Sequence, residues 1–224
     1  MKFRKIELLM FGLLLSVGIS AREYHVSVKG DDGYNGSAPK PFLTISRAAR
    51  EAMPGDTVTV HAGVYREQIT PPRGGDSDLK RIVYQAAPGE KVEIKGSEII
   101  KGWKRLDHDT WMVKIPNVFF GKFNPYSDLI RGDWFSPQPA GRKYHTGAVY
   151  LNGDWLMEAA VQEEVMRPAD EKNLLWWGEV DSSMTTIRAQ FRNVDPNQET
   201  TEINVRQTVF YPDKPFINFI TIRG

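Results

Sequence analysis

The sequence has 224 residues, of which 41% are hydrophobic, 29 are basic, 28 are acidic and none is cysteine. This length and apolar content allow one sizeable core or two small ones, and they exclude an intrinsically disordered chain. The absence of cysteine excludes a disulfide scaffold and a lipid-anchored lipoprotein.

Residues 1–21 have the pattern of a secretory signal peptide. Lys2, Arg4 and Lys5 form a basic region, Leu8 to Ile19 is apolar, and Ser20-Ala21 provides small residues for cleavage. The apolar run is shorter than the roughly 18 residues of a spanning helix. We therefore expect export to the periplasm or the exterior, with no membrane span after cleavage; an uncleaved anchor is the alternative.

Cleavage would also change the charge balance. It takes three of the 29 basic and one of the 28 acidic side chains, which leaves a slightly negative chain. Nucleic acid and anionic membrane surfaces both bind best to a basic protein surface, so neither is expected as a partner.

Residues 22–100 change their hydrophobic period within a short distance. Ile45 to Met53 places apolar residues on one helical stripe, Thr44 is suited to cap its start, and Pro54-Gly55 ends it. Strands are predicted at Thr57 to Ala62, Val64 to Ile69, Arg81 to Gln85 and Val92 to Lys95.

The spacing of these strands predicts a parallel β-helix. Val58 and Ile82 occupy equivalent places 24 residues apart, with turns and no helix between them. The helix is then expected to cap the first coil; an ordinary helix in an α+β domain is the alternative.

Residues 101–205 have a different character and predict an antiparallel β insertion resembling a sandwich. This region holds all six tryptophans, Trp103, Trp111, Trp134, Trp155, Trp176 and Trp177. Asn152-Gly153 predicts a two-residue hairpin turn, and Asp181 to Ser183 predicts a second turn between strands. Residues 206–224 return to short alternating strands, so we expect an incomplete resumption of the β-helix and a sequence that stops before its cap.

No motif predicts a metal, a nucleotide or another cofactor. The four histidines lack metal spacing, and "KGDDGYNGS" lacks the full pattern of a calcium loop, so its Asp31, Asp32 and Asn35 are interpreted as turn formers. Tryptophan faces stack on sugar rings, which favours a carbohydrate partner. The candidate sugar contacts lie in one loop-like stretch and are Tyr126, Asp133, Trp134, Tyr144 and His145.

Several segments resemble one known family when taken in order. They include "KPFLTISRAAREAMPGDTVTVHAGVYRE", "RIVYQAAPGEKVEIKGSE", "FFGKFNPY", "EVDSSMTTIRAQF" and "DPNQETTEINVRQTVFYP". Together they resemble the N-terminal portion of the β-xylosidases of glycoside hydrolase family 120. The resemblance implies a right-handed parallel β-helix interrupted by a β-sandwich. It also implies a retaining hydrolase that removes xylose from xylo-oligosaccharides.

The resemblance places both catalytic carboxyl groups on later coils, beyond Gly224, so no residue of this chain is assigned a catalytic role and this chain alone is expected to be inactive. Three alternatives remain open at this stage. They are a polysaccharide lyase on the same fold, a non-catalytic carbohydrate-binding module, and an aromatic insertion that serves as an oligomer contact.

Overall fold

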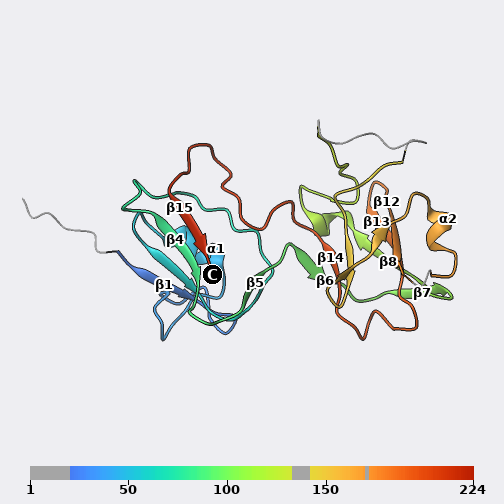
Figure 1. Ribbon diagram of the computed structural model, residues 1–224, viewed down its shortest axis with the longest axis horizontal. Helices are drawn as coiled ribbons and strands as arrows, with labels where there is room; N and C mark the ends of the chain where they lie inside the picture. The colour runs from blue at the N-terminus through green and yellow to red at the C-terminus, as the bar shows by residue number, and fades with distance from the viewer. Residues whose placement is uncertain (1–20, 133–141, 170–171) are drawn as a thin grey trace, which may run out of the picture.

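A computed structural model describes residues 21–132, 142–169 and 172–224. The chain is mostly β, with several sheets and few helices, and it forms two lobes that lie side by side (Figure 1). We call them the parallel lobe, built from β1 to β5, α1 and β15, and the antiparallel lobe, built from β6 to β14 with α2.

The parallel lobe contains two sheets in which every pair is parallel. The larger has the strand order β1-β2-β4-β15, and the smaller pairs β3 with β5. Their bounds are β1 Glu23–Val26, β2 Thr57–Val60, β3 Gly63–Tyr65, β4 Ile82–Ala86, β5 Val92–Ile94 and β15 Ile220–Arg223. Tyr24, Val58, Tyr84 and Ile222 occupy one row across the larger sheet, and the first three are buried.

The helix α1, Ile45–Glu51, packs its apolar stripe into the core of this lobe. Ile45, Ala48 and Ala49 are buried with Val58 and Ile82. Thr44 Oγ1 accepts the amide of Arg47 at 3.0 Å, which confirms the predicted cap. The helix stops two residues before the predicted Met53. Ala52 already has an extended ψ of 132°, and Met53 directly precedes Pro54, which disfavours helical angles at Met53.

Turn-forming side chains hold the entrance to this helix. Asp32 accepts the amides of Leu43 and Thr44, each at 2.9 Å, and Asp31 accepts the amide of Gly33 at 2.7 Å. Glu67 accepts the amides of Ile45 and Ser46, each at 2.8 Å. The interpretation of the Asp31 segment as a turn is therefore confirmed.

The antiparallel lobe contains a four-stranded and a five-stranded sheet, ordered β10-β9-β14-β6 and β11-β12-β13-β8-β7. The strands of the first are β6 Ser97–Ile99, β9 Val149–Leu151, β10 Asp154–Trp155 and β14 Thr201–Asn204. Those of the second are β7 Lys104–Asp107, β8 Thr110–Pro116, β11 Met157–Glu158, β12 Leu175–Val180 and β13 Met184–Gln190. All pairs are antiparallel except β11 with β12. Two short helical turns, η1 Asn117–Phe120 and α2 Gln162–Val165, complete the lobe.

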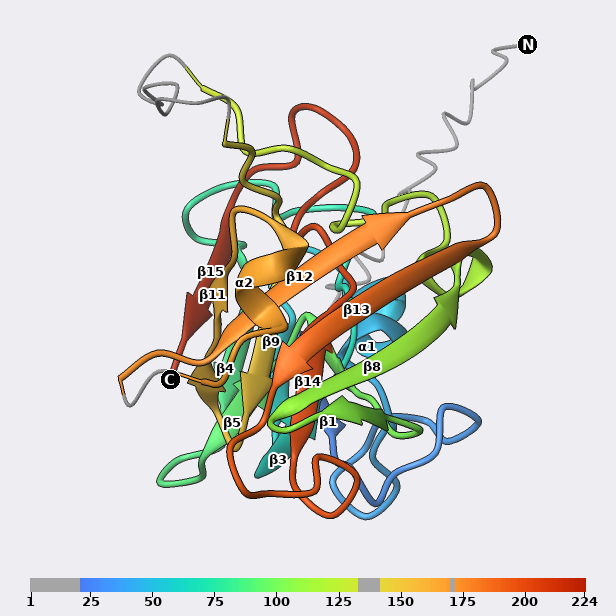
Figure 2. The ribbon, with the colours of Figure 1, turned by 90° about the vertical axis from the view of Figure 1, so that its right-hand side faces the viewer.

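Both sheets contribute to one apolar core. Val149 and Ile203 come from the four-stranded sheet, while Trp176 and Ile187 come from the five-stranded sheet, and all four are almost fully buried in the same cluster. The long strands β8, β12 and β13 cross in front of β9 and β14 (Figure 2). The predicted hairpins are confirmed: β9 pairs with β10 across Asn152-Gly153, and β12 pairs with β13 across the turn at Asp181.

The lobes are connected through two segments that lie side by side. The strand β6 leaves the parallel lobe and pairs with β14, whose end leads back toward β15. Ile99 lies opposite Glu202, so the two ends of the antiparallel lobe meet at this pair.

Candidate functional site

The sugar-contact residues predicted from the sequence fall in three different settings. Asp133 and Trp134 lie outside the described residues. Tyr126 is 2% exposed, and its ring packs edge-on against Phe120 and Trp176. Its hydroxyl donates to the carbonyl of Ala148 at 2.7 Å, and burial raises the pKa of this phenol. In this structure Tyr126 is a core residue of the antiparallel lobe.

His145 and Glu158 form the centre of the candidate site. His145 Nδ1 lies 2.6 Å from Glu158 Oε1, and the His145 amide donates to Oε2 at 2.9 Å. Because the carboxylate accepts, Nδ1 carries a proton, and Nε2 is the ring nitrogen that does not face Glu158. The side chains of His145 and Glu158 are 22% and 11% exposed, so the pair is held firmly but is still reached by solvent.

The surrounding residues hold this pair between the strand β11 and a loop. Glu158 belongs to β11, and His145 makes an isolated bridge with Leu129. Thr146 Oγ1 donates to Asp128 Oδ2 at 3.0 Å on the next rung. The polar groups therefore come from a loop braced against a strand, which is a common origin of binding residues.

Tyr144 lies beside this pair under a guanidinium group. The Arg142 Cζ atom is 4.7 Å from the centre of the Tyr144 ring, and Arg142 Nη2 donates to the Glu158 carbonyl at 2.5 Å. An aromatic ring, an imidazole nitrogen and charged groups together can recognise a polyol by stacking and by hydrogen bonds. Sequence reasoning missed Arg142 and Glu158, because Glu158 is separated from the loop by an intervening hairpin.

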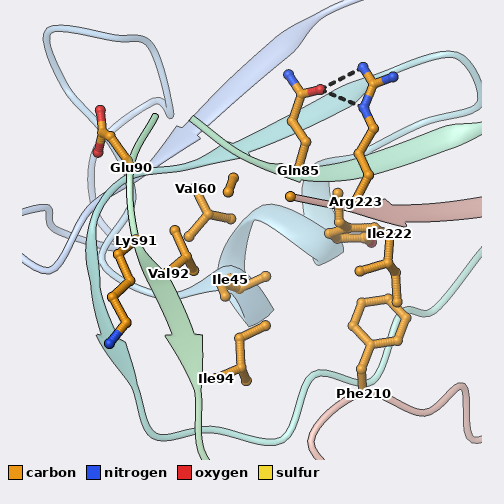
Figure 3. A pocket seen from close by; sticks show the side chains of 13 residues that line it. Ile45, Val60, Gln85, Glu90, Lys91, Val92, Ile94, Phe210, Ile222 and Arg223 are labelled. Atoms are coloured by element: carbon orange, nitrogen blue, oxygen red, sulfur yellow. Dashed lines mark hydrogen bonds between the residues drawn. The ribbon is translucent and has the colours of Figure 1, made fainter. Parts of the chain in front are cut away.

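A cavity in the parallel lobe has a lining that is poorly suited to a polar ligand. About 570 Å³ of space in the parallel lobe is lined mainly by apolar side chains, with Gln85, Glu90, Lys91 and Arg223 also on its wall. Figure 3 shows Ile45 between Val92 and Ile94 on one side and Ile222 and Phe210 on the other. Arg223 donates to Gln85 Oε1 at 2.6 and 3.0 Å. This cavity is the interior of the lobe, exposed beside the edge strand β15.

Metal ligands and membrane spans were also sought. Within the described ranges, no group of three His, Asp or Glu side chains has the geometry to hold a metal ion. In the same part of the chain, every helix is too short or too polar to cross a membrane.

Comparisons with known proteins show what this chain is similar to. A solved structure of XylC with xylose superposes with a TM-score of 0.84 and 44% identity, covering 90% of this chain and 34% of the XylC chain. The uncharacterized protein YwoF of Bacillus subtilis (strain 168) is 30% identical over 91 residues, which are 41% of this chain and 18% of YwoF. This chain thus spans about a third of XylC and less of YwoF.

A family model provides the final comparison. The model described as "Glycoside hydrolase 120, insertion domain" matches residues 100–203, which form most of the antiparallel lobe. The family resemblance expected from the sequence motifs is confirmed. Residues 100–203 of this chain are therefore similar to the insertion domain of glycoside hydrolase family 120.

Proposed function

We propose that this chain is part of an exported glycoside hydrolase that removes xylose from xylo-oligosaccharides with retention of configuration. The observation that carries the proposal is the similarity to XylC, whose structure was solved with xylose, over 90% of this chain. The family 120 insertion domain supports the same class of enzyme.

The architecture proposed for the whole protein is a right-handed parallel β-helix interrupted by a sandwich-like insertion. The row of Tyr24, Val58, Tyr84 and Ile222 in parallel register is what stacked coils produce. We place the first coils in residues 22–100, the insertion in 101–205 and the next coil in 206–224, with α1 as the cap.

The catalytic carboxyl groups are proposed to lie in the part of the enzyme that this chain does not cover. A retaining glycosidase needs two carboxyl groups about 5 Å apart. Here Glu158 is bound to His145, Glu202 to Arg66 and Glu67 to the start of α1. These carboxylates have structural partners, so the role we propose for the His145 site is to bind hydroxyl groups.

The test is an assay of two proteins with a chromogenic β-xyloside and with xylobiose. We expect a protein encoded by the complete reading frame to release xylose as the β-anomer first, as seen by proton NMR, and residues 22–224 alone to release none. Turnover by residues 22–224 would contradict the placement of the catalytic pair. Inactivity of the complete protein on every xyloside would contradict the substrate.

Export has its own test. Mass spectrometry of the protein secreted by a bacterial host should show a mature chain that begins at Arg22. A chain that retains residues 1–21 and sediments with membranes would identify an anchor instead.

A further inference from the structure

The tryptophans that the structure describes lie in different settings. Trp103 and Trp176 are 3% and 1% exposed and belong to the core of the antiparallel lobe. Trp111 packs against the same core, and Arg188 lies over the ring of Trp177. Among the tryptophans that the structure describes, Trp155 is the exception, with 68% of its surface exposed. Core packing therefore does not explain why a tryptophan occupies position 155.

The fold displays Trp155 on a rigid support. Trp155 belongs to the edge strand β10, which follows the Asn152-Gly153 turn, and it lies opposite Tyr150 on β9. The adjoining strand β9 also pairs with β14, so the hairpin is anchored in the four-stranded sheet. An indole in water on an anchored strand keeps its apolar face exposed and costs little ordering entropy when it binds a partner.

A cavity of about 340 Å³ adjoins this indole. Its wall contains the apolar side chains of Leu174 and Leu156. Its polar members are Asp154, Lys172, Asn173 and Arg192. The lining therefore combines aromatic and aliphatic side chains with carboxylate, amide and cationic groups.

This combination fits a pyranose ring. The C–H face of a sugar stacks on an indole, while its equatorial hydroxyl groups need both donors and acceptors at the edge of the ring. Asn173 offers both, Asp154 accepts, and Lys172 and Arg192 carry donors.

We propose that the Trp155 pocket binds a pyranose unit of a xylo-oligosaccharide, so that the insertion domain holds the sugar chain. The choice of xylose rests on the proposed function, whereas the binding of a neutral pyranose rests on the pocket itself.

The experiment uses the whole chain and measures binding of xylohexaose, cellohexaose and mannohexaose by calorimetry and by the indole N–H signals in NMR spectra. We expect xylohexaose to bind and to shift the signal that disappears in Trp155→Ala. This variant should weaken binding by about tenfold or more, while Trp155→Tyr keeps most of it. The matched control is Tyr211→Ala, which removes an aromatic ring that is 63% exposed outside the pocket.

Each outcome decides something different. Binding of cellohexaose or mannohexaose at Trp155 without xylohexaose would keep the sugar site and contradict the choice of xylose. Unchanged affinity in Trp155→Ala, or no binding of any of the three, would overturn the site even if the complete enzyme hydrolyses xylosides. A wild-type dimer that becomes monomeric in Trp155→Ala on sedimentation, with no sugar binding, would identify a contact between copies instead.

Discussion

Arg66 and Glu202 form an ion pair at the junction of the two lobes, with Nη1 and Oε1 2.5 Å apart. Arg66 follows β3 of the parallel lobe, and Glu202 is on β14 of the antiparallel lobe. Ser97 Oγ donates to Glu202 Oε1 at 3.0 Å, and Lys95 Nζ lies 3.2 Å from Oε2. The Glu202 side chain is 3% exposed, so the two lobes share a buried charge cluster.

Neutralising this carboxylate should weaken the junction. In Glu202→Gln, Arg66 and Lys95 lose the buried carboxylate with which both of them pair. We expect a loss of about 3 kcal/mol in the free energy of unfolding. Urea denaturation monitored by fluorescence measures it. The matched control is Glu179→Gln, which breaks an ion pair with Arg188 on a side chain 49% exposed and should cost less than about 1 kcal/mol. Equal losses in both variants would contradict the special role of the junction.

The same cluster predicts that the stability of the fold depends on pH. Burial opposes ionisation of Glu202, but hydrogen bonds from Arg66, Ser97 and Lys95 outweigh it and lower the pKa of this carboxyl below its ordinary value of 4.5. A lowered pKa in the folded state stabilises the fold above the unfolded value and loses this contribution as pH falls through the folded value. Wild-type stability should therefore drop below about pH 4.5. The Glu202→Gln variant should show a smaller drop over the same window.

Tyr126→Phe separates packing from sugar recognition. Removing the hydroxyl deletes the 2.7 Å bond to the Ala148 carbonyl, which still accepts the amide of Asn204 at 3.2 Å. We expect a loss of about 1 kcal/mol in stability and unchanged affinity for xylohexaose. A selective loss of affinity at unchanged stability would instead make Tyr126 a direct sugar contact.

The hairpin that carries Trp155 depends on its turn. Asn152 and Gly153 have φ angles of 53° and 92°, and a Cβ added at Gly153 meets no atom within 4 Å. Gly153→Ala should therefore cost about 1 kcal/mol through backbone strain alone. Thermal unfolding tests this value. The control is Gly96→Ala, where φ is not positive and an added Cβ makes only ordinary contacts, the nearest with Val209 Cγ1 at 3.4 Å. Equal effects at both positions would exclude the strain explanation.

The cap of α1 gives a further test. Thr44→Ala removes the acceptor for the Arg47 amide and the donor to Asp32 Oδ2 at 2.8 Å, so we expect a loss of about 1 kcal/mol. Thr44→Ser keeps both bonds and should lie within about 0.5 kcal/mol of the wild type. A larger loss for Ser than for Ala would show that the methyl group, and not the hydroxyl, matters.

Local sequence signals predicted where helices and hairpins occur more successfully than they predicted contacts between distant residues. Thr44 and Pro54 frame α1, and Asn152-Gly153 and Asp181 mark the two hairpins, because each acts on backbone angles within a few residues. The predicted strand from Val64 to Ile69 is shorter in the structure and ends at Tyr65. Beyond this strand, Arg66 forms an ion pair with Glu202, and Glu67 accepts an amide at the start of α1. A local sequence pattern cannot predict contacts between residues so far apart in the chain.

The candidate site was harder to predict for the same reason. A tryptophan count suggested sugar binding, but it could not separate Trp176 in the core from Trp155 on an edge strand, since exposure depends on which sheet covers which. Glu158 gave no signal near His145 in the sequence. The turn preceding Trp155 was the one local clue that an indole would be displayed.

The pairing of β15 with β4 has a consequence for the nascent chain. Residues 82–86 leave the ribosome long before residues 220–223, on the order of ten seconds at ordinary elongation rates. During that interval the edge of β4 that β15 will occupy lacks its final neighbour and can be captured by other strands. Pairing of Ile99 with Glu202 shortens the effective loop, since it brings the ends of the insertion domain together. Prompt folding of the insertion domain would thus protect the parallel lobe from aggregation during synthesis.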